Sequence, residues 1–155
     1  MLNLEKLLNT ESYLLIKKPT SKKMVLNSIC DKAVQTYKID KNQLLIDLVK
    51  REKIGNTTIG NGIAIPHVQN KAVSKPNCIV TILSEGLNLD AIDNKPVDII
   101  VLLILPDINK SQNLQTLAQI SRLLRNSEIT NKLRGSKSEE SAFAIISQYI
   151  KDKAA

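Results

Sequence analysis

The segment Val97-Asp-Ile-Ile-Val-Leu-Leu-Ile-Leu105 is the strongest indicator of the architecture of this chain. Within it, residues 99–105 form the longest fully apolar run of the sequence. Successive side chains of a strand point to opposite faces of its sheet, so a strand that is apolar at consecutive positions has to be covered on both faces. The stretch therefore predicts a central strand with helices on each side of the sheet. Because a membrane-spanning helix needs roughly 20 apolar residues, we expect no membrane insertion.

Outward from this strand, helices are predicted both before and after it along the chain. Polar residues suited to helix N-caps precede apolar residues that recur with a period of 3.6. The predicted helices run from Thr20 or Ser21 to about Tyr37, from Lys41 (capped by Asp40) to about Lys53, from Ser111 to a break at Asn126-Ser127, from that break to Gly135, and from Ser138 to about Lys151. Two of the stripes expected to face inward comprise Leu44, Leu45, Leu48 and Val49, and Leu114, Leu117, Ile120, Leu123 and Leu124.

Three further strands are predicted, at Ser12–Lys17, Ile63–His67 and Cys78–Leu83. No repeat, low-complexity segment or linker divides the sequence, so residues 1–155 are predicted to form one domain. Helices followed by strands and then by helices predict the α/β class. We expect a single-domain sandwich in which a mixed, mostly parallel β-sheet is flanked by helices on both faces.

The composition is basic, with 22 Lys and Arg against 15 Asp and Glu and a net charge of +7. Lys, Asn and Ile together fill 52 of the 155 positions while Arg occurs four times, which indicates a background bias in residue usage more than a selected basic surface. The lysines look evenly spread, and the chain has three Tyr, one Phe and no Trp for stacking on bases. We therefore expect no nucleic-acid partner, and a steep salt dependence of DNA affinity would overturn that expectation.

The termini and the cysteines favour a reduced, cytoplasmic protein. The first residues contain Glu5 and Glu11 and do not form a secretory signal. Cys30 and Cys78 lie 48 positions apart in no paired motif, so neither a disulfide framework nor a metal site is predicted. Gly60-Asn-Gly62 is a lone Gly-x-Gly without the rest of a nucleotide-binding motif, and no cofactor is expected.

His67 is the only histidine in the chain, and an imidazole is the one side chain whose ordinary pKa lies near neutrality. It directly follows Pro66, which biases Ile65 toward an extended backbone. We expect His67 to lie at the end of a strand, where α/β sheets commonly carry functional groups. Considered alone, a single surface histidine is more often structural than functional.

The surrounding segment changes that balance. Arg51-Glu-Lys-Ile-Gly-Asn-Thr-Thr-Ile-Gly-Asn-Gly-Ile-Ala-Ile-Pro-His67 closely resembles the signature of the type-2 enzyme IIA domains of the bacterial sugar phosphotransferase system (PTS), the fructose/mannitol class. Within that class it is most similar to the nitrogen-regulatory branch. The resemblance continues through Leu89-Asp-Ala-Ile-Asp-Asn-Lys-Pro-Val-Asp98 and the helix near Asn113, so it covers nearly the whole chain.

The resemblance implies a phosphohistidine carrier rather than an enzyme that turns over a small substrate. His67 would receive a phosphoryl group from a small phosphocarrier protein such as HPr, and Arg51 would help to hold the phosphate. Phosphoryl transfer requires positioning and positive charge, and an arginine supplies a permanently charged, bidentate donor. Backbone N–H groups around Gly60 and Gly62, or a helix N-terminus, would be additional donors.

One position departs from the family pattern. The family commonly has a second histidine at the start of the helix after the central strand, where this chain has Asn113 and Gln115 as the candidate positions. Neither amide titrates or carries charge, so we expect transfer to persist with an altered rate or pH dependence. The resemblance implies regulatory targets such as potassium-transport regulators. The alternative is a regulatory binding module of the same fold that acts by docking alone.

Overall fold

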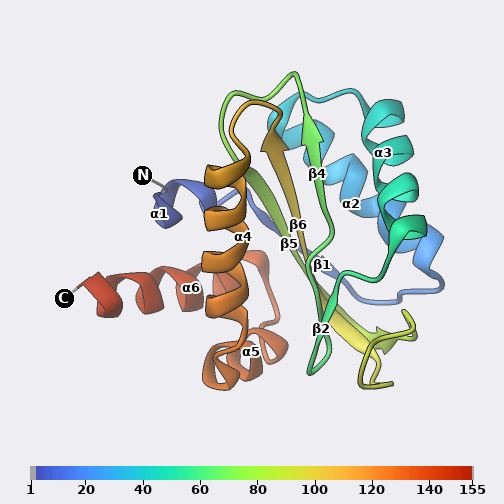
Figure 1. Ribbon diagram of the computed structural model, residues 1–155. Coiled ribbons are helices and arrows are strands. Elements are labelled where there is room, and N and C mark those ends of the chain that lie inside the picture. Colours follow the sequence, from blue (N-terminus) through green and yellow to red (C-terminus); the bar gives the residue numbers. More distant parts are fainter. Residues whose placement is uncertain (1–2, 155) are drawn as a thin grey trace.

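A six-stranded sheet divides the computed structural model, which describes residues 3–154, into two helical layers (Figure 1). The strands are β1 (Tyr13–Ile16), β2 (Thr58–Gly60), β3 (Ile63–Ala64), β4 (His67–Asn70), β5 (Asn77–Leu87) and β6 (Val97–Pro106). Their order is β1-β5-β6-β3-β2, with β4 also paired to β6. The β1–β5, β3–β6 and β4–β6 pairs are parallel, whereas β5–β6 and β2–β3 are antiparallel. The predicted mixed, mostly parallel sheet is confirmed.

Strand β6 is covered on both faces, as its sequence predicts. Its residues alternate between two hydrophobic clusters: Ile99, Val101, Leu103 and Leu105 belong to one, and Val97, Ile100, Leu102 and Ile104 to the other. All of these side chains are at most 4% exposed. Because successive side chains of a strand point to opposite faces, β6 contributes to both hydrophobic cores.

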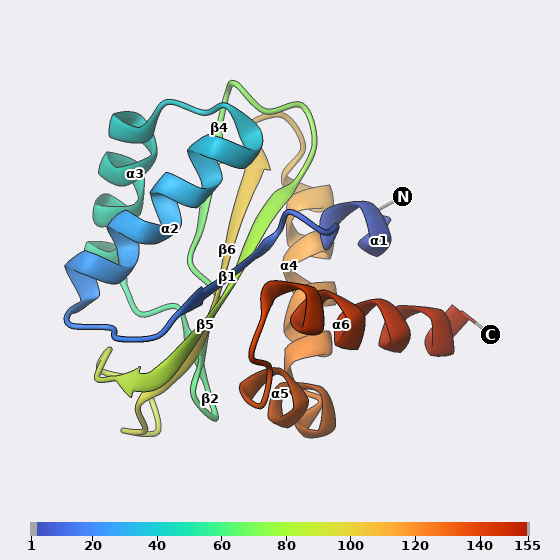
Figure 2. The ribbon, with the colours of Figure 1, turned by 180° about the vertical axis from the view of Figure 1, so that it is seen from behind.

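Each cluster is closed by its own layer of helices. Helices α2 (Lys22–Tyr37) and α3 (Lys41–Ile54) cover one face of the sheet. The other face is covered by α4 (Lys110–Leu124), α5 (Ser127–Arg134), α6 (Glu139–Ala154) and the short α1 (Leu4–Leu7), which sequence reasoning did not predict (Figure 2). No helix within residues 3–154 combines the length and the apolar character needed to cross a membrane.

The predicted caps mark the helix boundaries. The Ser21 side chain accepts a hydrogen bond from the backbone N–H of Met24 at 3.1 Å, and the Asp40 side chain accepts one from Gln43 at 2.9 Å. Asn126 caps α5, and Gly135 ends it. Side chains of this type satisfy N–H groups that the first turn of a helix leaves without a partner.

Two residues expected to face the core are exposed instead. Val49 is 41% exposed because Leu44 and Leu48 carry the contact between α3 and the sheet. Leu114 is 67% exposed because the first turns of α4 bury Asn113 and Thr116. In both helices the apolar stripe read from the sequence was wider than the face that meets the sheet.

The strand predicted over residues 63–67 is interrupted. Pro66 has no N–H to donate to a sheet, and the chain leaves the regular ladder at Ile65 and Pro66. The Pro66 carbonyl still accepts a hydrogen bond from Leu103 N–H at 2.9 Å. His67 therefore begins β4 and does not end a strand, which corrects the expectation. Strand β2, formed by residues 58–60, was not predicted either.

The positive charge is not evenly spread, contrary to the sequence-based interpretation. Residues 17–53, which include most of the α2–α3 layer, contain ten Lys and Arg and only four Asp and Glu. This segment therefore carries a net charge of +6 out of the +7 of the whole chain. The basic part of the sequence therefore includes α2 and nearly all of α3.

Candidate functional site

Three of the residues singled out from the sequence line one open pocket of about 530 Å³ between α3, β4 and α4. They are Arg51, His67 and Asn113. The remaining lining residues are Asp47, Lys50, Ile54, Val68, Gln69, Leu105, Lys110, Leu114 and Leu117. The pocket thus combines one imidazole, a cluster of cationic side chains and an apolar floor.

His67 is held in one orientation by its own backbone neighbourhood. It pairs with Leu103 of β6 and is partly buried. Its Nδ1 lies 2.8 Å from the carbonyl oxygen of Ile65. A carbonyl oxygen only accepts hydrogen bonds, so Nδ1 carries the ring proton of the neutral imidazole. The lone pair is then on Nε2, which makes no hydrogen bond to any of residues 3–154.

Arg51 lies in the last turn of α3 and is available to an anion. Its Nη1 donates to the carbonyl of Gly55 at 3.1 Å. No carboxylate within the described part of the chain is at ion-pair distance from it. Asp47, one turn earlier, accepts a hydrogen bond from Gln43 Nε2 at 2.9 Å. The charge of Arg51 is therefore not neutralised by any carboxylate of residues 3–154.

Two lysines extend this positive region, and sequence reasoning did not select them. Lys50 and Lys110 are exposed and line the same pocket, so its three cationic groups outnumber the single carboxylate of Asp47. Lys50 precedes the arginine of the motif, and Lys110 opens the helix after the central strand. These two positions could have indicated that both lysines lie near the site. Because the sequence contains 18 lysines, the positions alone did not distinguish these two from the others.

Asn113 closes the pocket from the first turn of α4. Its side chain is buried, and its Nδ2 donates to the carbonyl of Pro106 at 2.9 Å. The N-cap of the helix is Asn109, whose side chain accepts from Gln112 N–H at 3.2 Å. The positive end of the helix dipole is thus directed toward the His67 side of the molecule, where an anion would be stabilised.

Gln115, Gly60 and Gly62 lie elsewhere. Gln115 is exposed and lines a different hollow together with Tyr37 and Lys75. The glycines flank Asn61 in the turn between β2 and β3, where all three residues have positive φ. The Asn61 N–H already donates to Asp93 Oδ2 at 2.8 Å.

The glycine turn is also remote from the imidazole. The Gly62 carbonyl accepts from Asp98 and Ile99 at the start of β6, whereas His67 pairs with Leu103. Five residues along a strand correspond to about 16 Å. The structure therefore does not place the backbone N–H groups of Gly60 and Gly62 in the His67 pocket, and the start of α4 is the nearer source of N–H groups.

A second arginine, Arg134, contacts this glycine turn, and sequence reasoning did not identify it. Arg134 Nε lies 3.0 and 2.9 Å from the two carboxylate oxygens of Asp98, and its Nη2 contacts the carbonyl of Asn61. Arginine and aspartate are 36 positions apart, so no local pattern connects them. This pair ties α5 to the sheet.

The two thiols lie in the core, away from the pocket. Cys30 and Cys78 are both buried and unpaired. Burial raises the pKa of Cys30 to about 11 and that of Cys78 to about 12. Neither thiol is therefore ionised near neutral pH.

Comparison with known families gives a match over most of the chain. Residues 6–149 match the family model described as phosphoenolpyruvate-dependent sugar phosphotransferase system, EIIA 2. A nitrogen regulatory protein of Pseudomonas aeruginosa is 32% identical over 147 residues, which is 94% of this chain and 96% of the relative. A nitrogen regulatory protein of Escherichia coli K12 is 34% identical over 128 residues, covering 81% of this chain and 78% of the relative.

The fold also matches a solved structure. The crystal structure of the nitrogen regulatory protein IIA-Ntr from Neisseria meningitidis superimposes with a TM-score of 0.81 at 24% identity. The match covers 92% of this chain and 97% of that one. The sheet with its two helical layers is therefore the fold of that protein too.

Proposed function

The chain belongs to the EIIA type-2 family of the phosphoenolpyruvate-dependent sugar phosphotransferase system, and from this we propose that it is a phosphocarrier that takes a phosphoryl group on His67. The donor is an HPr-like phosphocarrier protein, and the phosphorylation state of His67 controls how the chain interacts with its regulatory targets. The observation that carries the proposal is the hydrogen bond from His67 Nδ1 to the Ile65 carbonyl, within a pocket that holds Arg51.

The hydrogen bond determines which nitrogen reacts. With the proton held on Nδ1, the lone pair on Nε2 attacks the phosphorus atom of the donor's phosphohistidine. A bond forms between phosphorus and Nε2 of His67 while the bond between phosphorus and the donor's nitrogen breaks. The donor's phosphohistidine reacts with a proton on its other ring nitrogen, so its ring leaves as a neutral imidazole. The positive charge that develops on the His67 ring is stabilised through Nδ1–H by the Ile65 carbonyl.

The cationic side chains stabilise the transferred group. The phosphoryl oxygens carry the charge in a loose transition state, so catalysis depends on positioning and on nearby positive charge. Arg51 supplies a planar pair of N–H donors, and Lys50 and Lys110 contribute two further charges. The N-terminus of α4 adds its partial positive charge to the same side of the pocket.

The rim of the pocket suits docking of a protein donor. Ile54 and Leu114 are 82% and 67% exposed and lie on opposite walls of the pocket, on α3 and α4. Exposed apolar side chains beside a charged centre are characteristic of a protein-binding surface. The charge of the α2–α3 layer favours a donor with an acidic docking face, because complementary charges accelerate association.

The regulatory part of the proposal rests on the relatives. The similar curated proteins of Pseudomonas aeruginosa and Escherichia coli are nitrogen regulatory proteins, and we place this chain in the same kind of role. Its targets are then other proteins, with potassium-transport regulators as one candidate class. Phosphorylation of His67 adds negative charge to a basic pocket rim, which changes the surface that such a target meets.

One observation favours the alternative of a docking module without phosphoryl transfer. Asn113 occupies the pocket in a position where the family commonly has its second histidine, and an amide provides no titratable group. Phosphoryl transfer does not require a second histidine, because the Ile65 carbonyl already accepts the hydrogen bond from His67 Nδ1 and Arg51 supplies positive charge for the phosphoryl oxygens. The two functions therefore differ in a single measurable property, the ability to accept phosphate.

The test is transfer of labelled phosphate. The protein is mixed with phosphoenolpyruvate, the general phosphotransferase enzyme and HPr, and an acid-labile phosphate on the chain is measured. We expect the label on the wild type and on Gln69→Ala, a neighbour that lines the same pocket. We expect no label on His67→Ala. Label that persists on His67→Ala contradicts the site, and absence of label on the wild type favours the docking module.

A further inference from the structure

The connection between α3 and β2, residues 55–57, holds both functional side chains of the His67 pocket. The carbonyl of Gly55 accepts from Arg51 Nη1 at 3.1 Å. Two residues later, the carbonyl of Thr57 accepts from Ile65 N–H at 2.9 Å. The carbonyl of Ile65 in turn accepts from His67 Nδ1 at 2.8 Å. A displacement of this connection therefore moves the guanidinium and the imidazole together.

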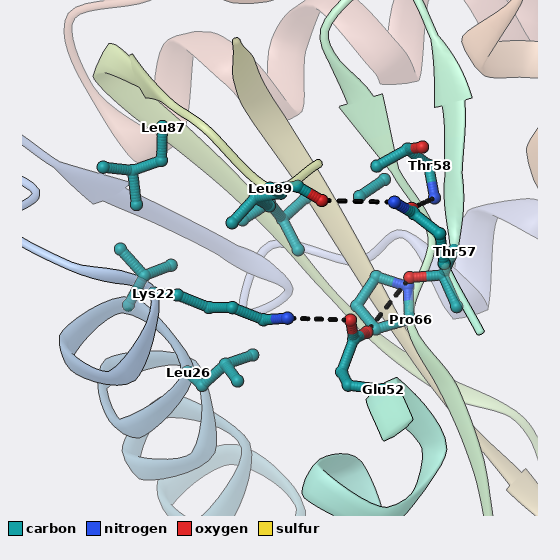
Figure 3. A pocket seen from close by; sticks show the side chains of 12 residues that line it. Lys22, Leu26, Glu52, Thr57, Thr58, Pro66, Leu87 and Leu89 are labelled. Atoms are coloured by element: carbon teal, nitrogen blue, oxygen red, sulfur yellow. Dashed lines mark hydrogen bonds and ion pairs between the residues drawn. The ribbon is translucent and has the colours of Figure 1, made fainter. Parts of the chain in front are cut away.

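Glu52 anchors that connection from the last turn of α3. Its Oε1 accepts a hydrogen bond from Thr57 Oγ1 at 3.2 Å, and its Oε2 lies 3.1 Å from Lys22 Nζ at the start of α2 (Figure 3). The side chain of Glu52 is only 18% exposed, whereas that of Lys22 is 45% exposed. The carboxylate thus joins three segments of the chain, and the more enclosed of its two contacts is the one to Thr57.

The enclosed space between this carboxylate and Pro66 is too small for a ligand, whereas the outer sides of Lys22 and Glu52 line an open hollow of about 500 Å³ between α2 and α3. Figure 3 shows Lys22, Glu52, Thr57 and Pro66 around a cavity of about 20 Å³, which has room for one water molecule at most. Pro66 lines this cavity, and His67 is the next residue along the chain. The polar groups gathered behind the Pro-His segment therefore act on the protein itself and not on a bound molecule.

We propose that Glu52 is a positioning residue for phosphoryl transfer: through Thr57 it holds residues 55–57 where Gly55 orients Arg51 and Ile65 keeps the proton of His67 on Nδ1. The inference rests on the proposed function and adds to it a residue that does not touch the reacting atoms. A reacting geometry tolerates little displacement, since an error of about 1 Å costs up to about 100-fold in rate.

The rate test uses four single variants and one double variant, Glu52→Ala/Thr57→Val, with HPr as the phosphoryl donor. Glu52→Ala removes both contacts, and we expect about tenfold slower transfer at saturating HPr, with the half-saturating HPr concentration unchanged because Glu52 is not on the pocket rim. Glu52→Gln retains an oxygen acceptor for Thr57 and restores most of the rate. Lys22→Met, the matched control, breaks only the ion pair and changes the rate less than about twofold.

Thr57→Val supplies the second arm, because it removes the hydroxyl and keeps the shape. It reproduces the slow transfer of Glu52→Ala, and the double variant is no slower than either single one. A double variant that is slower by the product of the two effects contradicts the shared route. A slow Lys22→Met contradicts it as well, since the ion pair and not the Thr57 contact would then carry the effect.

A measurement on the unphosphorylated protein separates this inference from the proposed function. Nitrogen-15 NMR at pH 8 reports which ring nitrogen of His67 carries the proton. We expect the Nδ1–H form in the wild type and in Lys22→Met, and a mixture of tautomers in Glu52→Ala. An unchanged tautomer and an unchanged rate in a variant that melts at a lower temperature would overturn the inference, leaving Glu52 a stabilising residue only. If the wild type accepts no phosphate, the proposed function fails, and the tautomer of His67 in Glu52→Ala alone tests whether Glu52 positions the imidazole.

Discussion

Two hollows of nearly equal volume, about 530 and about 540 Å³, open at opposite halves of β6, and arginine side chains line both. In the His67 pocket, Arg51 contacts the carbonyl of Gly55 and no carboxylate of residues 3–154. In the other hollow, Arg134 binds both oxygens of Asp98. Neither volume nor positive charge distinguishes the two. The contrast lies between two of these arginines: the protein already neutralises Arg134, whereas the charge of Arg51 is left for an incoming anion. Arg125, which also lines the second hollow, is exposed.

The largest expected effect comes from removing that available charge. Arg51→Ala slows phosphoryl transfer about 100-fold, comparable to the loss of one preorganised donor at a reacting oxyanion. Its melting temperature stays within a few degrees of the wild type, because the side chain has only one hydrogen-bond partner among residues 3–154. Arg122→Ala, an exposed arginine of α4 that lines neither hollow, is the control for net charge. Transfer at the wild-type rate in Arg51→Ala refutes the contrast between the two arginines.

The glycine turn of the second hollow tests stability instead. A Cβ at Gly62 would lie 2.8 Å from Arg134 Nη2 and 2.9 Å from Asp98 Oδ1, at a φ of +80°. Gly62→Ala should cost about 3 kcal/mol, of which 1–2 kcal/mol is backbone strain. Gly60→Ala has similar strain, but its nearest neighbour would be Asp93 Oδ2 at 3.5 Å, so about 1–2 kcal/mol is expected. Urea unfolding measures the difference; equal losses would show that the Arg134 cluster is not sensitive to crowding.

Arg134→Ala is the direct counterpart of Arg51→Ala. It leaves Asp98 without its partner in a half-buried position and should cost about 2 kcal/mol of unfolding free energy. For a chain of this size the melting temperature falls by roughly 4–8 °C. The transfer rate, measured well below that temperature, stays within about twofold of the wild type. A rate loss comparable to that of Arg51→Ala would remove the distinction between a structural and a functional arginine.

The pocket amide offers a smaller effect with a matched control. Asn113→His places a titratable group beside His67, while Gln115→His places one on the other side of the helix. Below the ordinary histidine pKa of about 6.5 the new imidazole is cationic and attracts the phosphoryl oxygens. Transfer by Asn113→His should therefore be a few-fold faster at pH 6 than at pH 8, relative to the wild type. Gln115→His should follow the wild-type pH profile, and an equal response of both variants contradicts the placement of Asn113.

The smallest effect concerns acid stability of the second region. Backbone N–H groups of Asn61 and Lys95 lower the pKa of the exposed carboxyl of Asp93. A carboxyl with a lowered folded-state pKa stabilises the fold above its unfolded pKa of about 3.8, and this contribution is lost as the pH falls through the folded-state value. The melting temperatures of the wild type and Asp93→Asn should therefore differ slightly at pH 6 and converge below pH 3.8. A difference in melting temperature that becomes larger as the pH falls would contradict the stabilising role of the ionised Asp93.

Periodicity and capping predicted the fold well, because they are local properties. The alternation in Val97–Leu105 fixed both cores, and Ser21, Asp40 and Asn126 marked helix starts. The same local reasoning failed at Ile65 and Pro66, where a missing N–H divides one expected strand into two. It also left Asn113 and Gln115 equivalent, although residues two positions apart in a helix point about 200° apart. The spacing of Asn113 to Lys110 and Leu117 would have identified the pocket side.

The supporting contacts of both regions were beyond sequence reasoning. Glu52 meets Lys22 from 30 positions away, and Arg134 meets Asp98 from 36 positions away. No periodicity connects such pairs, because the topology of the sheet brings them together. The motif indicated His67 and Arg51, but only the structure separates an arginine that is available from one that is already paired.

The most direct test of the central claim is the site of phosphate attachment. The protein, labelled with nitrogen-15, is phosphorylated by HPr, and phosphorus–nitrogen couplings are measured in the imidazole ring of His67. We expect the phosphorus to couple to Nε2 while the proton stays on Nδ1, as the hydrogen bond to the Ile65 carbonyl requires. Phosphate on Nδ1, or on a residue other than His67, would contradict the function proposed for this pocket.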